Sequence, residues 1–99
     1  MTVIQGVLLE ERERNLRMQE QYLLEIASLP KGCIVKKTYK SGEYYYLYYR
    51  SNNKIVSDYL GKDTKKISEI QKAIDKRRHL EGIVKKLKIE LKQIDKVVR

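Results

Sequence analysis

The segment Tyr44–Arg50 contains five tyrosines in seven residues, within a chain of 99 residues that has no Phe and no Trp. A tyrosine ring can stack on a nucleic-acid base, and a Lys or Arg beside it can bind the neighbouring phosphate. These residue types at this density favour a surface that binds nucleic acid. A surface rich in Tyr and Lys is also typical of protein–protein contacts, so a protein partner is the alternative interpretation.

The tyrosine segment is expected to be the central strand of a three-stranded antiparallel sheet over residues 33–60. Tyr favours strands, and the flanking Ser41-Gly42 and Ser51–Asn53 favour turns. Side chains of a strand alternate between the two faces of a sheet. The more apolar face is assigned to the core and contains Tyr45, Leu47 and Tyr49. The other face exposes Tyr44, Tyr46, Tyr48 and Arg50.

A two-residue turn at Asn52-Asn53 predicts how the second hairpin pairs. The expected cross-strand pairs are Tyr49–Val56, Tyr45–Leu60, Tyr48–Ser57 and Tyr46–Tyr59. The register of the first strand stays open, because a turn at Ser41-Gly42 of two or three residues gives different faces. That register decides whether Lys36, Lys37 or both join the exposed tyrosines.

A second candidate site is a line of cations in the C-terminal third of the chain, with members seven residues apart. Residues at this spacing lie on one side of an α-helix, about 10 Å from one another. Such a line can bind successive phosphates and release their counterions. The alternative interpretation is a solvated flank of a coiled coil, where Lys is common. The line comprises Arg78, Lys85, Lys92 and Arg99, with Lys72, His79 and Lys86 on an adjacent line.

No catalytic or metal-binding set accompanies these residues, because the chain has one His and one Cys. We therefore expect neither enzymatic activity nor a metal or other cofactor. His79 is expected on the surface, and Cys33 is expected as a small buried side chain. The candidate nucleic-acid-binding residues are Lys36, Lys37, Tyr44, Tyr46, Tyr48, Arg50, Lys72, Arg78, Lys85, Lys86, Lys92 and Arg99.

Two helices are expected to frame the sheet within a single α+β domain spanning residues 1–99. The first helix is predicted over residues 7–29, after a loose end, and Pro30 ends it. Its inward-facing positions are expected to be Leu9, Leu16, Leu23 and Ile26. Arg12 and Gln19 lie between them, so this face is expected to be partly polar.

The second helix is predicted over residues 64–98, with Asp63 or Thr64 as its N-cap. Its apolar residues follow coiled-coil heptads, apart from a gap at Arg77. Its length of about 50 Å exceeds the roughly 35 Å of the first helix, so its C-terminal end is expected to lack a partner within the chain. A homodimer is therefore one expected assembly, through Val84, Leu87, Leu91, Ile94 and Val98.

The charge of the chain is +9 and is unevenly distributed. Residues 30–63 hold seven basic and three acidic groups, and residues 64–99 hold twelve and five, whereas residues 1–29 hold three and five. A basic sheet and a basic last helix indicate a polyanionic partner. No apolar run is long enough for a signal peptide or a membrane span, so we expect a cytoplasmic setting and no membrane contact.

The hairpin region also carries a resemblance, in Gly32–Lys37, Glu43–Leu47, Tyr49-Arg50 and Tyr59–Lys62. It resembles small uncharacterised bacterial and phage proteins that have a tyrosine-rich hairpin between two helices. It is also similar to the N-terminal segment of some insertion-sequence transposases, which carry a comparable Tyr-x-Tyr-Leu stretch and Tyr-Leu-Gly-Lys ending. The resemblance covers about a third of the chain. It implies a phage or mobile-element setting and brings no catalytic residues.

Three functional hypotheses follow. The first is a non-enzymatic nucleic-acid-binding protein of phage or mobile-element type. The second is a phage-type inhibitor, anti-CRISPR-like, that binds a host protein–nucleic acid complex. The third is a coiled-coil oligomerisation module.

Overall fold

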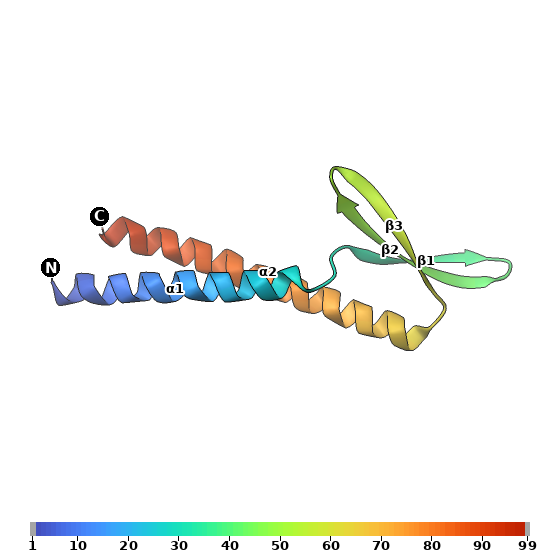
Figure 1. Ribbon diagram of the computed structural model, residues 1–99, viewed down its shortest axis with the longest axis horizontal. Helices are drawn as coiled ribbons and strands as arrows, with labels where there is room; N and C mark the ends of the chain where they lie inside the picture. The colour runs from blue at the N-terminus through green and yellow to red at the C-terminus, as the bar shows by residue number, and fades with distance from the viewer. Residues whose placement is uncertain (1, 99) are drawn as a thin grey trace. The chain divides into compact units, whose positions relative to one another are not determined.

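The computed structural model describes residues 2–98 and has the predicted α+β architecture of a helix, a three-stranded antiparallel sheet and a long helix (Figure 1). The chain forms two compact units. The helical unit comprises the chain up to Ser28 together with the chain from Arg78 onward, and the sheet unit comprises Leu29–Arg77. The elements are α1 (Val3–Ala27), β1 (Cys33–Tyr39), β2 (Gly42–Ser51), β3 (Lys54–Gly61) and α2 (Thr64–Val98).

α1 begins at Val3 rather than at residue 7, so the expected loose end is wrong. Thr2 is the N-cap: its hydroxyl accepts a hydrogen bond from the Gln5 N–H at 3.2 Å, and the Gln5 side chain accepts one from the Thr2 N–H at 3.1 Å. This capping box satisfies N–H groups that the first helical turn otherwise leaves without partners. The helix ends at Ala27, where Ser28 caps it.

The inward face of α1 is polar, as expected for Gln19, but Asn15 was not expected there and two of the expected leucines are exposed. Asn15 and Gln19 are buried, at 3% and 8% exposure, whereas Leu16 and Leu23 are 39% and 47% exposed. The Asn15 Nδ2 donates to the Leu87 carbonyl of α2 at 2.9 Å, and the Gln19 Nε2 donates to Asn15 Oδ1 at 2.6 Å. Burying an amide without a partner costs free energy, so these bonds favour one register of the two helices over its neighbours.

α1 covers the C-terminal part of α2, and this overturns the reasoning behind the expected homodimer surface. Besides the Asn15–Leu87 bond, Arg12 Nε contacts Asp95 Oδ1 at 2.9 Å. The end of α2 that was expected to lack a partner therefore has one in the same chain. Val84, Leu87 and Ile94 are buried, and Leu91 and Val98 are half-buried.

The N-terminal part of α2 belongs to the sheet unit and begins as predicted at Thr64. Asp63 is the N-cap, because its Oδ1 accepts from the Lys65 N–H at 3.0 Å. The heptad gap at Arg77 has a polar explanation: its Nη1 donates to the Leu29 carbonyl at 2.7 Å. Between these points Ile67 and Ile74 are buried.

The sheet has the order β1-β2-β3, and both hairpins close through two-residue turns. Asn52 and Asn53 have φ angles of 49° and 65°, as a primed turn requires. Three predicted pairs are confirmed: Tyr49–Val56, Tyr48–Ser57 and Tyr46–Tyr59. The fourth is wrong, because the register shifts between Tyr45 and Tyr46 and places Tyr45 opposite Gly61 instead of Leu60.

The first hairpin resolves the open register. Tyr39 pairs with Gly42 across the turn at Lys40-Ser41, so Lys37 lies opposite Tyr44 and Lys36 opposite Tyr45. Lys37 therefore shares the face of Tyr44, Tyr46 and Tyr48, while Lys36 lies on the other face. Cys33 starts β1 and is exposed, which corrects the expectation that it is buried.

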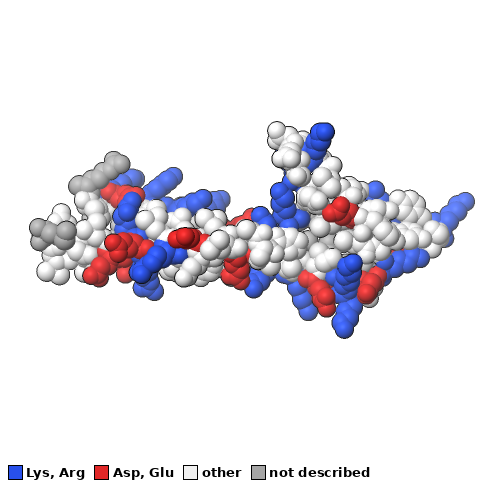
Figure 2. All heavy atoms as spheres, in the orientation of Figure 1, with Lys and Arg blue, Asp and Glu red and all other residues white. Residues whose placement is uncertain are grey.

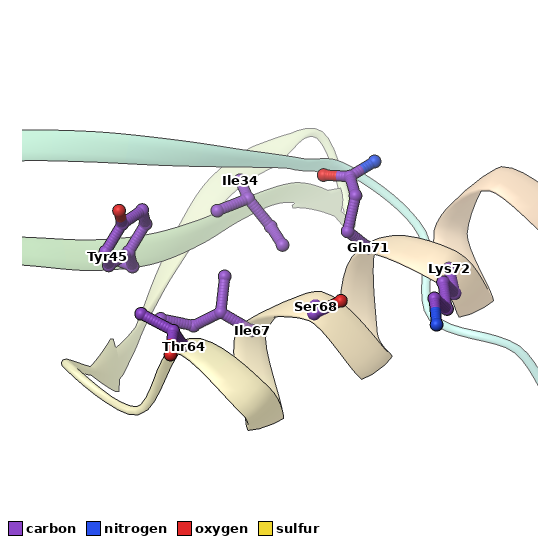
Figure 3. A pocket seen from close by; sticks show the side chains of 7 residues that line it. All are labelled: Ile34, Tyr45, Thr64, Ile67, Ser68, Gln71 and Lys72. Atoms are coloured by element: carbon purple, nitrogen blue, oxygen red, sulfur yellow. The ribbon is translucent and has the colours of Figure 1, made fainter.

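The face of the sheet assigned to the core lies against α2, but the contact is loose. Figure 3 shows Ile34 of β1 and Ile67 of α2 pointing toward each other, with Tyr45 beside them. A hollow of about 390 Å³ opens among these residues and Thr64, Ser68, Gln71 and Lys72. Ile34, Tyr45 and Leu47 are accordingly half-buried rather than buried. Among residues 2–98, neither helix has the length and apolar character that a membrane span requires.

Substitution of two glycines by alanine is expected to change the stability of the protein in opposite directions. Gly32 has a φ of 109°, and an added Cβ would lie 2.1 Å from the Tyr48 carbonyl oxygen, so Gly32→Ala should destabilise the fold by at least about 2 kcal/mol. Gly82 lies in α2 with no atom within 4 Å of an added Cβ, so Gly82→Ala should stabilise it by about 1 kcal/mol. Chemical denaturation followed by circular dichroism measures both. An unchanged midpoint for Gly32→Ala would contradict the close approach of Gly32 to β2.

Candidate nucleic-acid interface

The tyrosine face is the side of the sheet that points away from the Ile34–Ile67 contact. Strand alternation and the observed pairing place five rings on it, from all three strands. Among the residues of the sheet unit that the structure describes, no helix packs on this side, and the outermost rings, Tyr39 and Tyr59, are 50% and 60% exposed. The tyrosines are Tyr39, Tyr44, Tyr46, Tyr48 and Tyr59.

Four of the rings form a connected cluster around an open hollow. The ring centroids of Tyr44 lie 5.8 Å from Tyr39 and 6.2 Å from Tyr59, and those of Tyr46 and Tyr59 are 5.4 Å apart. The interplanar angles run from 43° to 54°, so the rings are tilted and leave parts of their faces uncovered. Together they line a hollow of about 280 Å³.

Two lysines lie over these rings. The Lys37 Nζ is 4.8 Å from the centroid of the Tyr46 ring and 5.3 Å from that of Tyr48. The Lys62 Nζ is 4.6 Å from the centroid of the Tyr44 ring and 3.4 Å from the Ser41 carbonyl oxygen, to which it donates. Cation–π attraction holds both ammonium groups at the surface of the cluster.

The two faces of the sheet differ in their charge balance: the face of Tyr45 and Leu47 carries Lys36 and Lys54 together with two carboxylates, whereas the tyrosine face carries cations alone. Both carboxylates of the strands lie on the face of Tyr45 and Leu47: Asp58 pairs with Leu47, and Glu43 forms an ion pair with Lys36 at 3.4 Å. The tyrosine face carries cations, and none of its strand residues described in the structure is a carboxylate. Its cations are Lys37 and Arg50, joined by Lys62 beyond the end of β3.

The tyrosine hydroxyls respond to this separation of charge. The hydrogen bond with Lys37, followed by one with Ser57, lowers the pKa of Tyr48. The same contact raises the pKa of Lys37. On the other face, the negative charge of Asp58 raises the pKa of Tyr49, which is the next residue along the strand.

Within the four-ring cluster, the pKa values of Tyr44 and Tyr46 are shifted in opposite directions. The Tyr44 hydroxyl is bonded to Ser41 Oγ at 3.0 Å, and this bond, together with the charge of Lys62, lowers the pKa of Tyr44. Desolvation among the neighbouring rings raises the pKa of Tyr46.

The structure brings together five of the predicted site residues, which are Lys37, Tyr44, Tyr46, Tyr48 and Arg50. It separates Lys36 from them, on the opposite face. Sequence reasoning missed Tyr39 and Lys62 as members of the same surface. Tyr59 was expected on this face, opposite Tyr46, but was not included among the candidate binding residues.

The remaining predicted residues lie on α2. Lys72 lines the hollow beside Ile67, on the other side of the sheet from the tyrosine face. Three members of the basic line, and Lys86 of the adjacent line, belong to the helical unit and are exposed, and Arg99 lies outside the described residues. Figure 2 shows acidic side chains interspersed with basic ones over the helices on the visible face, so the two signs are mixed there. The four exposed residues are Arg78, Lys85, Lys86 and Lys92.

Within residues 2–98, no group of three or more His, Cys, Asp or Glu side chains is placed to hold a metal ion. His79 is exposed on α2, as expected.

Comparison with known proteins identifies one family. Residues 6–72 match the family described as "Domain of unknown function (DUF6788)". The match includes most of α1, the whole sheet and the first turns of α2, and therefore every residue of the tyrosine face. No curated protein and no solved structure matches the chain.

The contact between Lys37 and Tyr48 predicts a shift in tyrosine ionisation. An ammonium group stabilises a phenolate, so Lys37→Ala should raise the pKa of Tyr48 and move the onset of tyrosinate absorbance to higher pH. An ultraviolet pH titration measures this onset, and Tyr48→Phe should remove the same early component. Lys36→Ala removes an equal charge from the opposite face and should leave the onset in place. An equal shift in both lysine variants would show that net charge alone controls the titration.

Proposed function

This chain belongs to the DUF6788 family, and we propose for it a non-enzymatic function: it binds nucleic acid through the tyrosine face. In this proposal the exposed rings contact bases, and three cations bind phosphates. The cations are Lys37, Arg50 and Lys62. In this proposal the hydroxyls take no part in bond making or breaking and instead form hydrogen bonds with base edges or phosphates at the rim of the surface.

The observation that carries this proposal is the sorting of charge between the two faces of the sheet. On a sheet surface that contacts only water, a carboxylate side chain is as acceptable as a cation. Here both strand carboxylates lie on the face of Tyr45, where Glu43 pairs with Lys36 and Asp58 lies opposite Leu47. A face of rings and cations without carboxylates is complementary to a polyanion that has flat apolar groups, and nucleic acid is that polyanion.

The basic line of α2 is proposed as an additional phosphate-binding surface. Its described members are exposed, and the chain from residue 64 onward holds most of the excess positive charge. Each phosphate that such a cation neutralises releases counterions and steepens the salt dependence of binding. The line supplies affinity without sequence information, because phosphate contacts are the same for every sequence. We propose this role for Lys72, Arg78, Lys85, Lys86, Lys92 and Arg99.

One observation favours a protein partner as a second candidate function. Leu16 and Leu23 lie seven residues apart on α1 and are substantially exposed, and Leu24 is 70% exposed. An exposed leucine line on a helix is typical of helix–helix contacts. It is compatible with the inhibitor or oligomerisation hypotheses, and with the phage or mobile-element setting that the hairpin resemblance implies. A stoichiometric partner that stays bound after nuclease treatment would favour this candidate.

Salt-dependent binding tests the main proposal. Purified protein, treated with nuclease and washed at high salt, is titrated into labelled oligonucleotides while fluorescence anisotropy is followed over a range of salt concentrations. We expect log affinity to fall linearly with log salt. Lys37→Ala and Lys62→Ala should each lower the slope by about 0.7–0.9, the contribution of one phosphate contact.

The matched control is Lys36→Ala, which removes the same charge from the adjacent residue on the opposite face. Its slope should equal that of the unchanged protein. Absence of binding to every oligonucleotide at low salt would overturn the proposal. An effect of Lys36→Ala as large as that of Lys37→Ala would move the interface away from the tyrosine face.

A further inference from the structure

We propose that the hollow lined by four tyrosines holds one unpaired base of a single-stranded nucleic acid, with the phosphates on either side of that base bound by Lys37 and Lys62. This inference rests on the proposed function and specifies its substrate class. The lining residues are Tyr39, Tyr44, Tyr46 and Tyr59.

The geometry of the rings favours a flat guest. Neighbouring centroids are 5.4–6.2 Å apart, and the planes are tilted by 43–54°. Rings in this arrangement touch at their edges and keep face area available, unlike rings that stack in parallel. The two outer rings, Tyr39 and Tyr59, are the most exposed of the four. A base that enters between them can stack on one ring and meet the edge of another.

The charges decide which flat or apolar guest fits. A cluster of tyrosines can also form a cage for a quaternary ammonium group, which binds to the negative ring faces. Here Lys37 already lies over Tyr46, and Lys62 already lies over Tyr44. Two of the four rings thus have their own cation, and a cationic guest would be repelled by both. A guest that is aromatic and carries negative charge on either side is attracted instead.

The two ammonium groups lie at different points along β2. The Lys62 Nζ is over Tyr44 and bonds to the Ser41 carbonyl at the β1–β2 turn, whereas the Lys37 Nζ is over Tyr46 and Tyr48. A nucleic-acid strand that follows β2 and places one base in the hollow therefore passes a cation before and after that base. Consecutive phosphates of one nucleic-acid strand supply this alternation of charge and ring.

The surface selects an unpaired base over a paired one. Bases in a duplex have both faces covered by their neighbours and present only their edges in the grooves. The tyrosine face offers ring faces on a sheet surface, and among the described residues of the sheet unit no helix stands on that side to enter a groove. Stacking on such rings requires a base that has left its own stack, as in single strands and loops.

Removal of bases from the ligand tests this inference. The full-length protein is titrated with three ligands at one salt concentration: an oligothymidylate, a strand of the same length in which abasic residues replace the nucleotides, and a duplex of the same length. The three share a phosphate backbone, so electrostatic attraction alone gives the abasic strand no disadvantage. We expect the abasic strand and the duplex each to bind at least about tenfold more weakly than the oligothymidylate. The oligothymidylate should also quench tyrosine fluorescence.

Variants assign the effect to the hollow. Tyr59→Ser removes an exposed ring and should weaken binding of the oligothymidylate about tenfold, while leaving binding of the abasic strand unchanged. Tyr59→Phe keeps the ring and should bind as the unchanged protein does. Ile55→Ser is the matched control, because Ile55 is exposed on the same face of β3 but does not line the hollow.

The outcomes separate the two proposals. Equal, salt-dependent binding of the normal and abasic strands would overturn the base-binding hollow and leave nucleic-acid binding in place. Duplex binding as tight as single-strand binding would overturn it as well. Failure to bind any of the three ligands at low salt would overturn the proposed function and this inference together.

Discussion

The register of β2 against its two neighbours is the constraint on which the rest of the sheet unit depends. Side chains alternate between faces, so a shift of one residue would exchange the tyrosine face and the face against α2. Two short turns prevent that shift, and the positive φ angles of Asn52 and Asn53 fit only the observed pairing of the second hairpin. Gly32 adds a steric lock, because its backbone approaches the Tyr48 carbonyl more closely than any side chain would permit.

This register gives adjacent tyrosines different chemistry. Tyr48 and Tyr49 are neighbours in sequence, but Tyr48 contacts Lys37 and Tyr49 lies near Asp58. The pKa of the first is lowered and that of the second is raised. The run of five tyrosines therefore contributes to two surfaces: one has cations and no strand carboxylate, and on the other Lys36 and Lys54 are balanced by Glu43 and Asp58. The separation depends on no single strong interaction: it follows from where Lys36 and Lys37 fall in the alternation.

Most of the architecture was predictable because its signals are local. The Asn-Asn turn, the central tyrosine strand and the bounds of α2 each follow from residues within a few positions of the feature itself. The errors have non-local causes. The β-bulge beside Tyr45 depends on how β3 leaves the sheet. The face on which Lys36 and Lys37 each lie depends on the length of the first turn, which the sequence left open.

The helical unit shows the same limit in its packing. Leu9, Leu16 and Leu23 follow the seven-residue spacing of a heptad more closely than the residues that actually face α2. A hydrophobic pattern cannot reveal that Asn15 finds the Leu87 carbonyl, because that bond exists only after the two helices have paired. The site was predictable to a similar extent. Strand alternation correctly placed Tyr46 and Tyr59 on one face. The place of Lys62 on that face was not predictable, because it depends on the contact of its side chain with Tyr44 and the Ser41 carbonyl.

The choice of tyrosine as the only aromatic residue type is consistent with a surface that stays open to solvent. A three-stranded sheet packed on one side by a helix must leave its other side wet, and exposed Phe or Trp rings there would invite association between copies. Tyr keeps the ring area that stacking requires and adds a hydroxyl that water can solvate in the absence of a ligand. Lys37 and Lys62 reinforce this, because their charges, each over one of the rings, discourage edge-to-edge pairing of sheets and would attract a polyanion. The same residues that keep the unliganded surface soluble are thus those that the proposed interface uses, so binding needs no rearrangement of the sheet to expose them.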